Sequence, residues 1–317
     1  MSKRYTKGSE WRIWDLHVHT PESALNNGFG ADWDEYVKQL FSKALVHNIA
    51  SIGITDYFSI EGYKKLKTQY LNNNTKLKEL EFSDEEIEKI HKILILPNIE
   101  FRLDKLVQDN RVNFHVLFSD EVAIKDIEEN FLHQLKIIVE GNPQEAGERR
   151  ALTINNLIAL GTRLQNEHAQ FRQHPSQLYT GMMNAVVSDD KISEILTDQP
   201  SLFKGKYLIA IPSDEDLSDV DWNNQGHLTR KILIQKSDCL FASNPNTRKW
   251  ALGNFGASPQ EYINEFKSLK PCIWGSDAHT FDELYTKNAS RLCWIKADPT
   301  FEGLKQIIYE PDERVSI

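Results

Sequence analysis

Short β-branched runs alternate with helical patterns through the first half of the chain, and this alternation restricts the possible folds more than any other feature. Residues 11–18 and 51–55 are predicted strands separated by a helical pattern. A stretch rich in Lys and Glu leads to two further predicted strands, residues 92–96 and 113–118. A strand–helix–strand repeat predicts parallel pairing and therefore an α/β fold.

The pattern changes between about residues 120 and 205. Apolar residues recur there at helical spacing, first over 127–138 and then over 152–164, which predicts a helical insertion. Its polar stretches contain His168 and His174, which we expect to be surface residues without a special role. Strands are predicted again in the last third of the chain, at 207–211, 232–235, 239–242, 271–275 and 291–296.

The length, net charge, cysteine content and apolar runs of the sequence limit the class of protein to which the chain can belong. No repeat or linker divides the 317 residues, so we expect one domain over 1–317 with the insertion at 120–205. The net charge of -9 argues against a protein that coats DNA through basic side chains. Three cysteines without C-x-x-C spacing, no apolar signal segment and no run long enough to span a membrane predict a soluble, cytoplasmic protein.

Two pairs of candidate metal ligands follow predicted strands at opposite ends of the sequence. His17 and His19 lie two residues apart, so a strand directs both imidazoles to the same side. Asp277 and His279 repeat this spacing after another apolar run. An H-x-H pair alone is weak evidence, but two such pairs at strand ends of one sheet favour a shared metal site.

Two more candidates are associated with apolar runs. Glu100 closes the run ILILPNIE, and His115 lies within VNFHVLF, where an unpartnered imidazole would be costly to bury. Imidazoles and carboxylates suit zinc, manganese or iron, and a carboxylate can bridge two ions. In a β/α barrel such residues gather at the carboxyl ends of the strands.

The order of these motifs resembles the PHP (polymerase and histidinol phosphatase) family of phosphoesterases. The matching pieces are DLHVHT at 15–20, GITDYF at 53–58, Glu100, His115 and GSDAH at 275–279. The resemblance implies a distorted TIM-like (β/α)7 barrel that binds two or three metal ions and hydrolyses phosphomonoesters or phosphodiesters. The metal ligands that it implies are His17, His19, Glu100, His115, Asp277 and His279.

The chain also departs from the family pattern. No further histidine follows the first pair closely, Tyr57 stands where the family reads T-D-H, and Ile211 stands where it reads A-H-P. We therefore expect one or two divalent ions, Mn, Zn or Fe with Mg as an alternative, rather than three. Asp56 is the best substitute, as a ligand or as a residue that orients one, and Asp214 and His227 are weaker substitutes.

Three segments are similar to the N-terminal PHP region of large TrlF-type proteins, namely residues 8–30, 52–63 and 291–311. Those proteins continue into an SMC-like or AAA-like ATPase and have been associated with defence against phage. The resemblance implies an ATPase domain or partner, which this sequence does not supply, because it contains no G-x-x-x-x-G-K-[ST] motif.

The leading hypothesis is a metal-dependent phosphoesterase that cleaves phosphodiesters in nucleic acid. Asp277 and His279 would serve catalysis, His279 as ligand or as proton donor, and Arg102 or Arg230 would clamp the phosphate. The alternatives are a small-metabolite phosphomonoesterase and a degenerate module that acts as a scaffold or nucleic-acid sensor. A nucleophilic hydrolase is disfavoured because no G-x-S-x-G is present. A homo-oligomer is a general expectation that no residue specifies.

Overall fold

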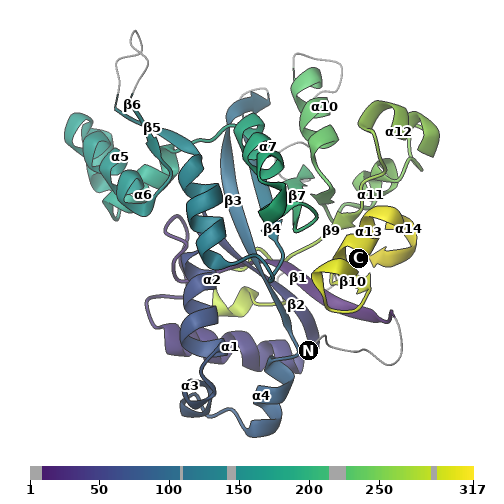
Figure 1. Cartoon of the computed structure of the whole chain (residues 1–317), viewed down its shortest axis with the longest axis horizontal. Coiled ribbons are helices and arrows are strands. Elements are labelled where there is room, and N and C mark those ends of the chain that lie inside the picture. The colour runs from purple at the N-terminus through teal and green to yellow at the C-terminus, as the bar shows by residue number, and fades with distance from the viewer. Residues whose placement is uncertain (1–8, 108–109, 141–147, 214–225, 287–290) are drawn as a thin grey trace.

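The computed structural model describes residues 9–107, 110–140, 148–213, 226–286 and 291–317. Its central feature is a nine-stranded, barrel-shaped sheet that is nearly closed, with helices around it (Figure 1). The strand order is β11-β10-β1-β2-β3-β4-β7-β8-β9. The strands are β1 (Trp11–His19), β2 (Ile49–Tyr57), β3 (Leu94–Val107), β4 (Asn110–Phe118), β7 (Tyr207–Pro212), β8 (Cys239–Phe241), β9 (Cys272–Ile273), β10 (Cys293–Lys296) and β11 (Val315–Ser316).

Helices connect the strands, as the sequence pattern predicts. The first is capped by Asp32, whose side chain accepts hydrogen bonds from the backbone N–H groups of Asp34 and Glu35, and it buries Tyr36 and Phe41. The helices of the barrel are α1 (Trp33–Val46), α2 (Glu61–Lys65), α3 (Asn74–Glu79), α4 (Asp84–Ile90), α10 (His227–Lys236), α11 (Pro245–Ala251), α12 (Pro259–Phe266), α13 (Phe301–Tyr309) and α14 (Pro311–Arg314). Within the described ranges, no helix has both the length and the apolar character needed to cross a membrane.

The distorted α/β barrel expected from the sequence is confirmed, with one correction to its strand directions. Strands β1, β2 and β3 pair in parallel, as do β7, β8 and β9. β4 instead runs antiparallel to both β3 and β7, because it follows β3 directly without an intervening helix. His115 therefore does not end a parallel strand, and it lies opposite Glu100 in the β3–β4 register.

The barrel closes at β1, which has two partners along the same edge. Its first half, Trp11 to Trp14, pairs antiparallel with β10. Its second half meets the segment that follows β9, through a parallel bridge between Val18 and Ala278. The backbone N–H of Asp277 donates to the His17 carbonyl at 2.8 Å, and that of His19 donates to the Ala278 carbonyl at 3.1 Å. The two predicted ligand pairs are thus neighbours in space.

The insertion between β4 and β7 is mostly helical and also contains a hairpin that the sequence pattern did not predict. Its elements are η2 (Asp126–Phe131), η3 (Leu132–Gln134), β5 (Lys136–Glu140), β6 (Glu148–Ala151), α5 (Ile154–Glu167), η4 (Ala169–Gln173), α6 (Gln177–Asn184), α7 (Asp189–Asp198) and α8 (Pro200–Phe203). Ile138, expected in a helix, lies in β5, where Ile137 and Val139 are buried on the opposite face. The strand expected at 232–235 is likewise wrong, because this run lies in α10, where Leu233 and Ile234 are buried.

Candidate metal centre

The six ligand candidates implied by the family resemblance come from four places in the barrel. His17 and His19 are at the carboxyl end of β1, Glu100 is in β3, His115 is opposite it in β4, and the Asp277/His279 pair follows β9. Asp277 has a φ of 48°, in the left-handed region that aspartate adopts more readily than most residues. The protein thus uses a bent backbone, in place of a regular strand, at this end of the site.

Five of these side chains place their ligating atoms at contact distance. The Nε2 atoms of His17 and His19 are 3.1 Å apart, and Oε2 of Glu100 lies 3.3 Å from each of them. Oδ1 of Asp277 lies 3.3 Å from the Nε2 atoms of His17, His19 and His279. Metal–ligand bonds of about 2.0–2.2 Å place neighbouring tetrahedral ligands roughly 3.4 Å apart, so these separations fit a shared ion.

The five residues form two overlapping groups among the described residues, each suited to hold one ion. The first consists of His17, His19 and Glu100, and the second of His19, Asp277 and His279. His19 belongs to both, but its Nε2 has a single lone pair and can bind only one ion. One ion therefore uses the whole cluster, or two ions divide it with a carboxylate as the bridge.

His115 lies beside these groups and has a buried nitrogen that needs a partner. The amide Nδ2 of Asn98 donates to the Leu16 carbonyl and to Thr55 Oγ1, so its Oδ1 faces His115 Nδ1 at 3.2 Å. This hydrogen bond assigns the proton to Nδ1 of His115. Its Nε2 is then a bare lone pair, which is buried without a hydrogen-bond partner among the described residues, while the ring centroid lies 4.6 Å from that of His17.

Hydrogen bonds outside the ligand set orient two other imidazoles in the same way. His279 Nδ1 donates to the Asn26 carbonyl at 2.8 Å. His19 Nδ1 donates to Ser23 Oγ at 2.8 Å, and that hydroxyl donates onward to Asp56 Oδ1 at 3.0 Å. Fixing the proton on Nδ1 leaves Nε2 free to bind a metal, which is the usual arrangement around metal-bound histidines.

Asp56 belongs to neither group, and it lies behind His19, which it orients through Ser23. Its Oδ1 accepts from Thr20 Oγ1 at 2.6 Å and from Ser23, and its Oδ2 accepts from the Gly62 backbone at 2.8 Å. Burial raises the pKa of Asp56 to about 7 despite these hydrogen bonds. Its contact with His19 runs through Ser23.

Charge in the cluster suits a cation. Burial opposes ionisation of Glu100, yet the adjacent His17 and His19 side chains hold the pKa of this carboxyl below its usual range. The pKa of Asp277 is also held below its usual range, because the neighbouring imidazoles outweigh burial. Burial lowers the pKa of His115 to about 3, so its imidazole is neutral. Ionised carboxylates and neutral imidazoles are the forms that bind metals.

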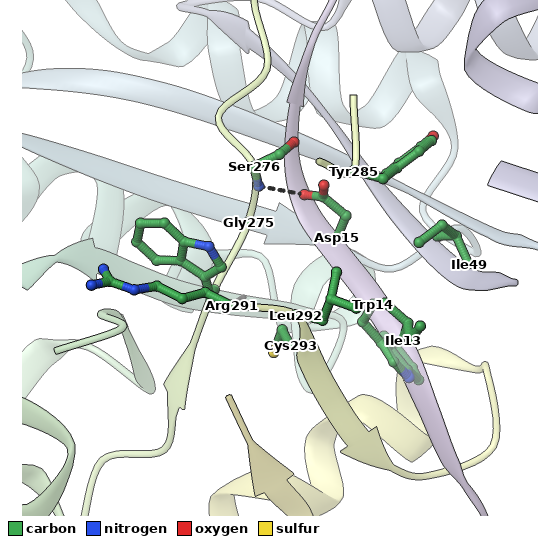
Figure 2. A pocket seen from close by; sticks show the side chains of 11 residues that line it. Ile13, Trp14, Asp15, Ile49, Gly275, Ser276, Tyr285, Arg291, Leu292 and Cys293 are labelled. Atoms are coloured by element: carbon green, nitrogen blue, oxygen red, sulfur yellow. Dashed lines mark hydrogen bonds between the residues drawn. The ribbon is translucent and has the colours of Figure 1, made fainter. Parts of the chain in front are cut away.

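A buried carboxylate behind the ligands joins the two sides of the site. Asp15 Oδ1 accepts from the Ser276 backbone N–H at 2.9 Å and from that of His17 at 3.3 Å. Figure 2 shows the Ser276 hydrogen bond at the wall of a cavity of about 20 Å³. A cavity of this size accommodates about one water molecule. Asp15 thus holds β1 against the segment that carries Asp277.

The other candidates from the sequence that the structure describes lie outside the two groups. Arg102 is two residues along β3 from Glu100, and its Nη1 donates to the Met183 carbonyl in the insertion at 2.9 Å. Arg230 packs in α10 with its guanidinium carbon 5.7 Å from the Trp250 ring. His227 is the first residue of α10, and Asp214 lies outside the described residues.

Several residues of the site were missed by sequence reasoning. Tyr57, at a position of a missing family histidine, places its ring 4.7 Å from His19, which in turn stacks on His279 at 4.0 Å. Asn98 could have been found, because it is a polar residue in an apolar strand two positions before Glu100. Ser23 and Asn26 carried no such signal, since they lie in a polar loop.

The topology and the candidate ligands together define a class, an α/β barrel with a buried histidine–carboxylate cluster. No family model and no curated protein matches the chain. Solved structures with a similar chain path include a protein named as a metal-dependent phosphoesterase from Bifidobacterium adolescentis. The two chains are 14% identical, the match covers 84% of this chain and 88% of that one, and the TM-score is 0.41.

Two further solved structures are similar over much of the chain. A two-domain protein from Bacteroides vulgatus, with a predicted PHP-like metal-dependent phosphoesterase, is 11% identical over 98% of this chain and 65% of its own, with a TM-score of 0.42. An amidohydrolase from Chromobacterium violaceum, with bound sulfate and no metal, is 13% identical over 84% and 88%, with a TM-score of 0.38.

Proposed function

We propose that this protein is a metal-dependent phosphoesterase that hydrolyses phosphodiester bonds in nucleic acid. One observation carries the proposal: side chains from the family motifs converge, and the buried Nε2 of His115 beside them has no partner within the described residues. An unpaired buried polar atom costs about 1–3 kcal/mol, and a metal ligand bond would remove that cost.

The ligand set fits one or two divalent ions of the manganese, zinc or iron type. His17, His19 and Glu100 would hold one ion, and Asp277, His279 and a bridging carboxylate would hold a second. A bound divalent ion acidifies water and neutralises charge on a phosphate, which supplies both the nucleophile and the electrostatic stabilisation of hydrolysis.

The exposure of the side chains in the cluster indicates the side from which a substrate reaches it. The Asp277 side chain is 30% exposed, whereas those of His19 and Glu100 are 0% and 5% exposed. A phosphate therefore approaches from the side of Asp277. His279 is assigned as a ligand rather than a proton donor, because its Nδ1–H is held by the Asn26 carbonyl and its Nε2 faces Asp277.

The wider biological context belongs to the same proposal. The three segments that resemble TrlF-type proteins support an SMC-like or AAA-like ATPase as partner and a role in antiviral defence. The acidic net charge of -9 predicts that the isolated chain binds duplex DNA weakly. A partner ATPase would then bring the nucleic acid to the metal centre.

The experiment that tests the proposal compares hydrolysis of bis(p-nitrophenyl) phosphate, p-nitrophenyl phosphate and single-stranded DNA in the presence of Mn²⁺, Zn²⁺ or Mg²⁺. The test variant is Asp277→Ala with His279→Ala, and the control is Asp282→Asn, an exposed acid in the same loop. We expect metal-dependent cleavage of the diesters that only the double variant loses.

Other results would assign a different function. Preference for the monoester would indicate a metabolite phosphatase. Absence of turnover with every ion, although the chain binds metal, would favour a module that senses or scaffolds. The side chains at the missing family histidines, the phenol of Tyr57 and the buried alkyl chain of Ile211, are the observation that favours this second candidate.

A further inference from the structure

The insertion contains a projecting lobe whose charge differs from the rest of the chain. We call residues 136–140 and 148–184 the arm; it comprises the β5–β6 hairpin, α5, η4 and α6. Figure 1 shows these elements together at one side of the molecule, away from the helices that follow β7. The arm has five basic residues and three acidic ones, in a chain with a net charge of -9. No aspartate or glutamate occurs between Glu167 and Asp189.

The tip of the arm carries a continuous row of rings. The ring centroids are 5.9 Å apart for His168 and Phe171, 5.4 Å for Phe171 and His174, and 5.2 Å for His174 and Tyr179. The first three residues are spaced by three around η4. A 3₁₀-helix has three residues per turn, so side chains at this spacing lie one above the other. The local backbone therefore builds the row.

These rings lie at the surface, outside the barrel core. His168 is exposed, and Phe171, His174 and Tyr179 are half-buried, while most residues between Asn166 and Gln177 are exposed. None of the four belongs to the buried core clusters. Packing of the fold thus does not account for a row of rings at this tip.

The tip is held in one conformation. Arg172 donates from Nε and Nη2 to the carbonyls of Gln165 and Asn166, at 3.0 and 3.1 Å. His174 Nδ1 lies 3.1 Å from Thr180 Oγ1. Helices α5 and α6 cross so closely that a Cβ on Gly161 would lie 1.8 Å from the Gln177 carbonyl oxygen. A surface ordered in this way loses little conformational entropy on binding.

The arm is attached to the strand that carries a metal-ligand candidate. At the carboxyl end of α6, the Met183 carbonyl accepts the hydrogen bond from Arg102. Val187 then forms a bridge to Leu103 in β3, and its carbonyl accepts from the Asp104 N–H. Glu100 is two residues from Arg102 in this strand. The eight residues of α6 rise about 12 Å, so the rings lie one short helix away from this attachment.

We propose that the arm binds single-stranded nucleic acid, with bases stacked on the ring row and phosphates attracted by the net positive charge of the arm. Positive charge combined with interleaved rings is the chemistry that recognises a single strand without base specificity. The inference rests on the proposed function, because it makes the arm the substrate-binding surface of the same metal centre. It also assigns a role to His168 and His174, for which the sequence predicted none.

The test measures fluorescence anisotropy of labelled oligo(dT) and oligo(rU) with the full chain, without added metal. The variant is Phe171→Ala with Tyr179→Ala, and the control is Gln170→Ala, an exposed residue in the same turn. We expect a loss of affinity of about tenfold per ring and near-wild-type affinity in the control. Phe171→Tyr with Tyr179→Phe retains both rings and should restore binding, which separates loss of the rings from misfolding.

The same variants distinguish this inference from the proposed function. The alanine pair should hydrolyse bis(p-nitrophenyl) phosphate at the wild-type rate, whereas Asp277→Ala should bind the oligonucleotides normally. Equal oligonucleotide affinity for wild type and the alanine pair would overturn the inference, whatever the hydrolysis results. If oligonucleotide binding depends on the rings but the protein hydrolyses no phosphate ester, the inference about the arm is supported and the proposed phosphoesterase activity is refuted. A difference between oligo(dT) and oligo(rU) would identify the preferred strand.

Discussion

Gly275→Ala should separate the two sides of the metal centre, because Gly275 lies directly against the backbone of β1. A Cβ at this position would be 2.5 Å from the His17 Cβ and 2.8 Å from its backbone nitrogen. Ordinary contact begins near 3.4 Å, so the two segments must part by roughly 1 Å. Overpacking of this kind costs about 1–3 kcal/mol of unfolding free energy.

The displacement acts on the candidate ligands. It stretches the 2.8 Å hydrogen bond from the Asp277 N–H to the His17 carbonyl, and it moves Asp277 Oδ1 from its 3.3 Å contacts with His17 and His19. A misplacement of about 1 Å in a preorganised site lowers activity roughly 100-fold. We expect a loss of this size in kcat/KM for the diester, with weaker metal binding in calorimetric titration.

Gly256→Ala is the matched control for this prediction. Gly256 has a φ of 77°, so alanine costs backbone strain there, but its Cβ would meet nothing within 4 Å. Urea unfolding should show a folded protein for both variants. If Gly275→Ala keeps the metal affinity and kcat/KM of Gly256→Ala, the close approach of β1 and the Asp277 segment does not organise the centre.

The remaining predictions concern buried polar groups. Ser23→Ala removes the hydroxyl that holds His19 Nδ1, so metal affinity should fall about 10- to 100-fold in calorimetry; unchanged affinity would remove Ser23 from the site. Asp189→Asn breaks a fully buried carboxylate that meets two lysine ammonium groups at 2.7 and 2.6 Å, so urea unfolding should show a loss of about 3–5 kcal/mol. The exposed Asp190→Asn should lose at most about 1 kcal/mol, and equal losses would refute the argument. Burial lowers the pKa of Lys270 from 10.5 to about 8, so the unfolded chain binds the extra proton between these values. Lys270 should therefore make stability rise by up to about 3 kcal/mol from pH 8 to 10.5, and Lys270→Met should abolish that part of the rise.

Strands with strong local patterns were predictable from the sequence. The β-branched run of β1 and the spacing of His17 and His19 predicted both a strand and a shared direction of the two imidazoles, and the structure has both. β2, β7 and β8 were also found within about two residues. Their signal is local, because alternating burial and β-branched residues act within a few positions.

Strand direction, and the choice between helix and strand for short apolar runs, could not be predicted from local sequence patterns. β4 runs antiparallel to β3 because the connection between these two strands is too short to contain a helix. The helical pattern before β3 instead suggested that the strand–helix–strand repeat would continue after it. The apolar run at 232–235 is short enough to fit a strand or one face of a helix, and tertiary packing selected α10. In β5, Ile138 is 50% exposed, so an apolar residue on the solvent face hid the alternation.

The convergence of the candidate residues could be predicted from the sequence, but the geometry in which they meet could not. Spacing identified the histidine and carboxylate pairs, while the tautomers depend on Asn98, Ser23 and the Asn26 carbonyl, which reach the imidazoles only in the folded chain. The position of Asp56 behind His19 also depends on the loop that brings Ser23 between them.

The closure of the barrel at β1 has a consequence for the order of events during synthesis. The hydrogen bond between Asp15 and Ser276 joins residues 261 positions apart in sequence. At the usual 5–20 residues per second, a ribosome needs roughly 10–50 s to pass from the first ligand pair to the second. Throughout that interval the nascent chain contains His17 and His19 but not Asp277 or His279. Capture of a metal ion by the full cluster would therefore be a late event, possible only after residue 279 has been synthesised.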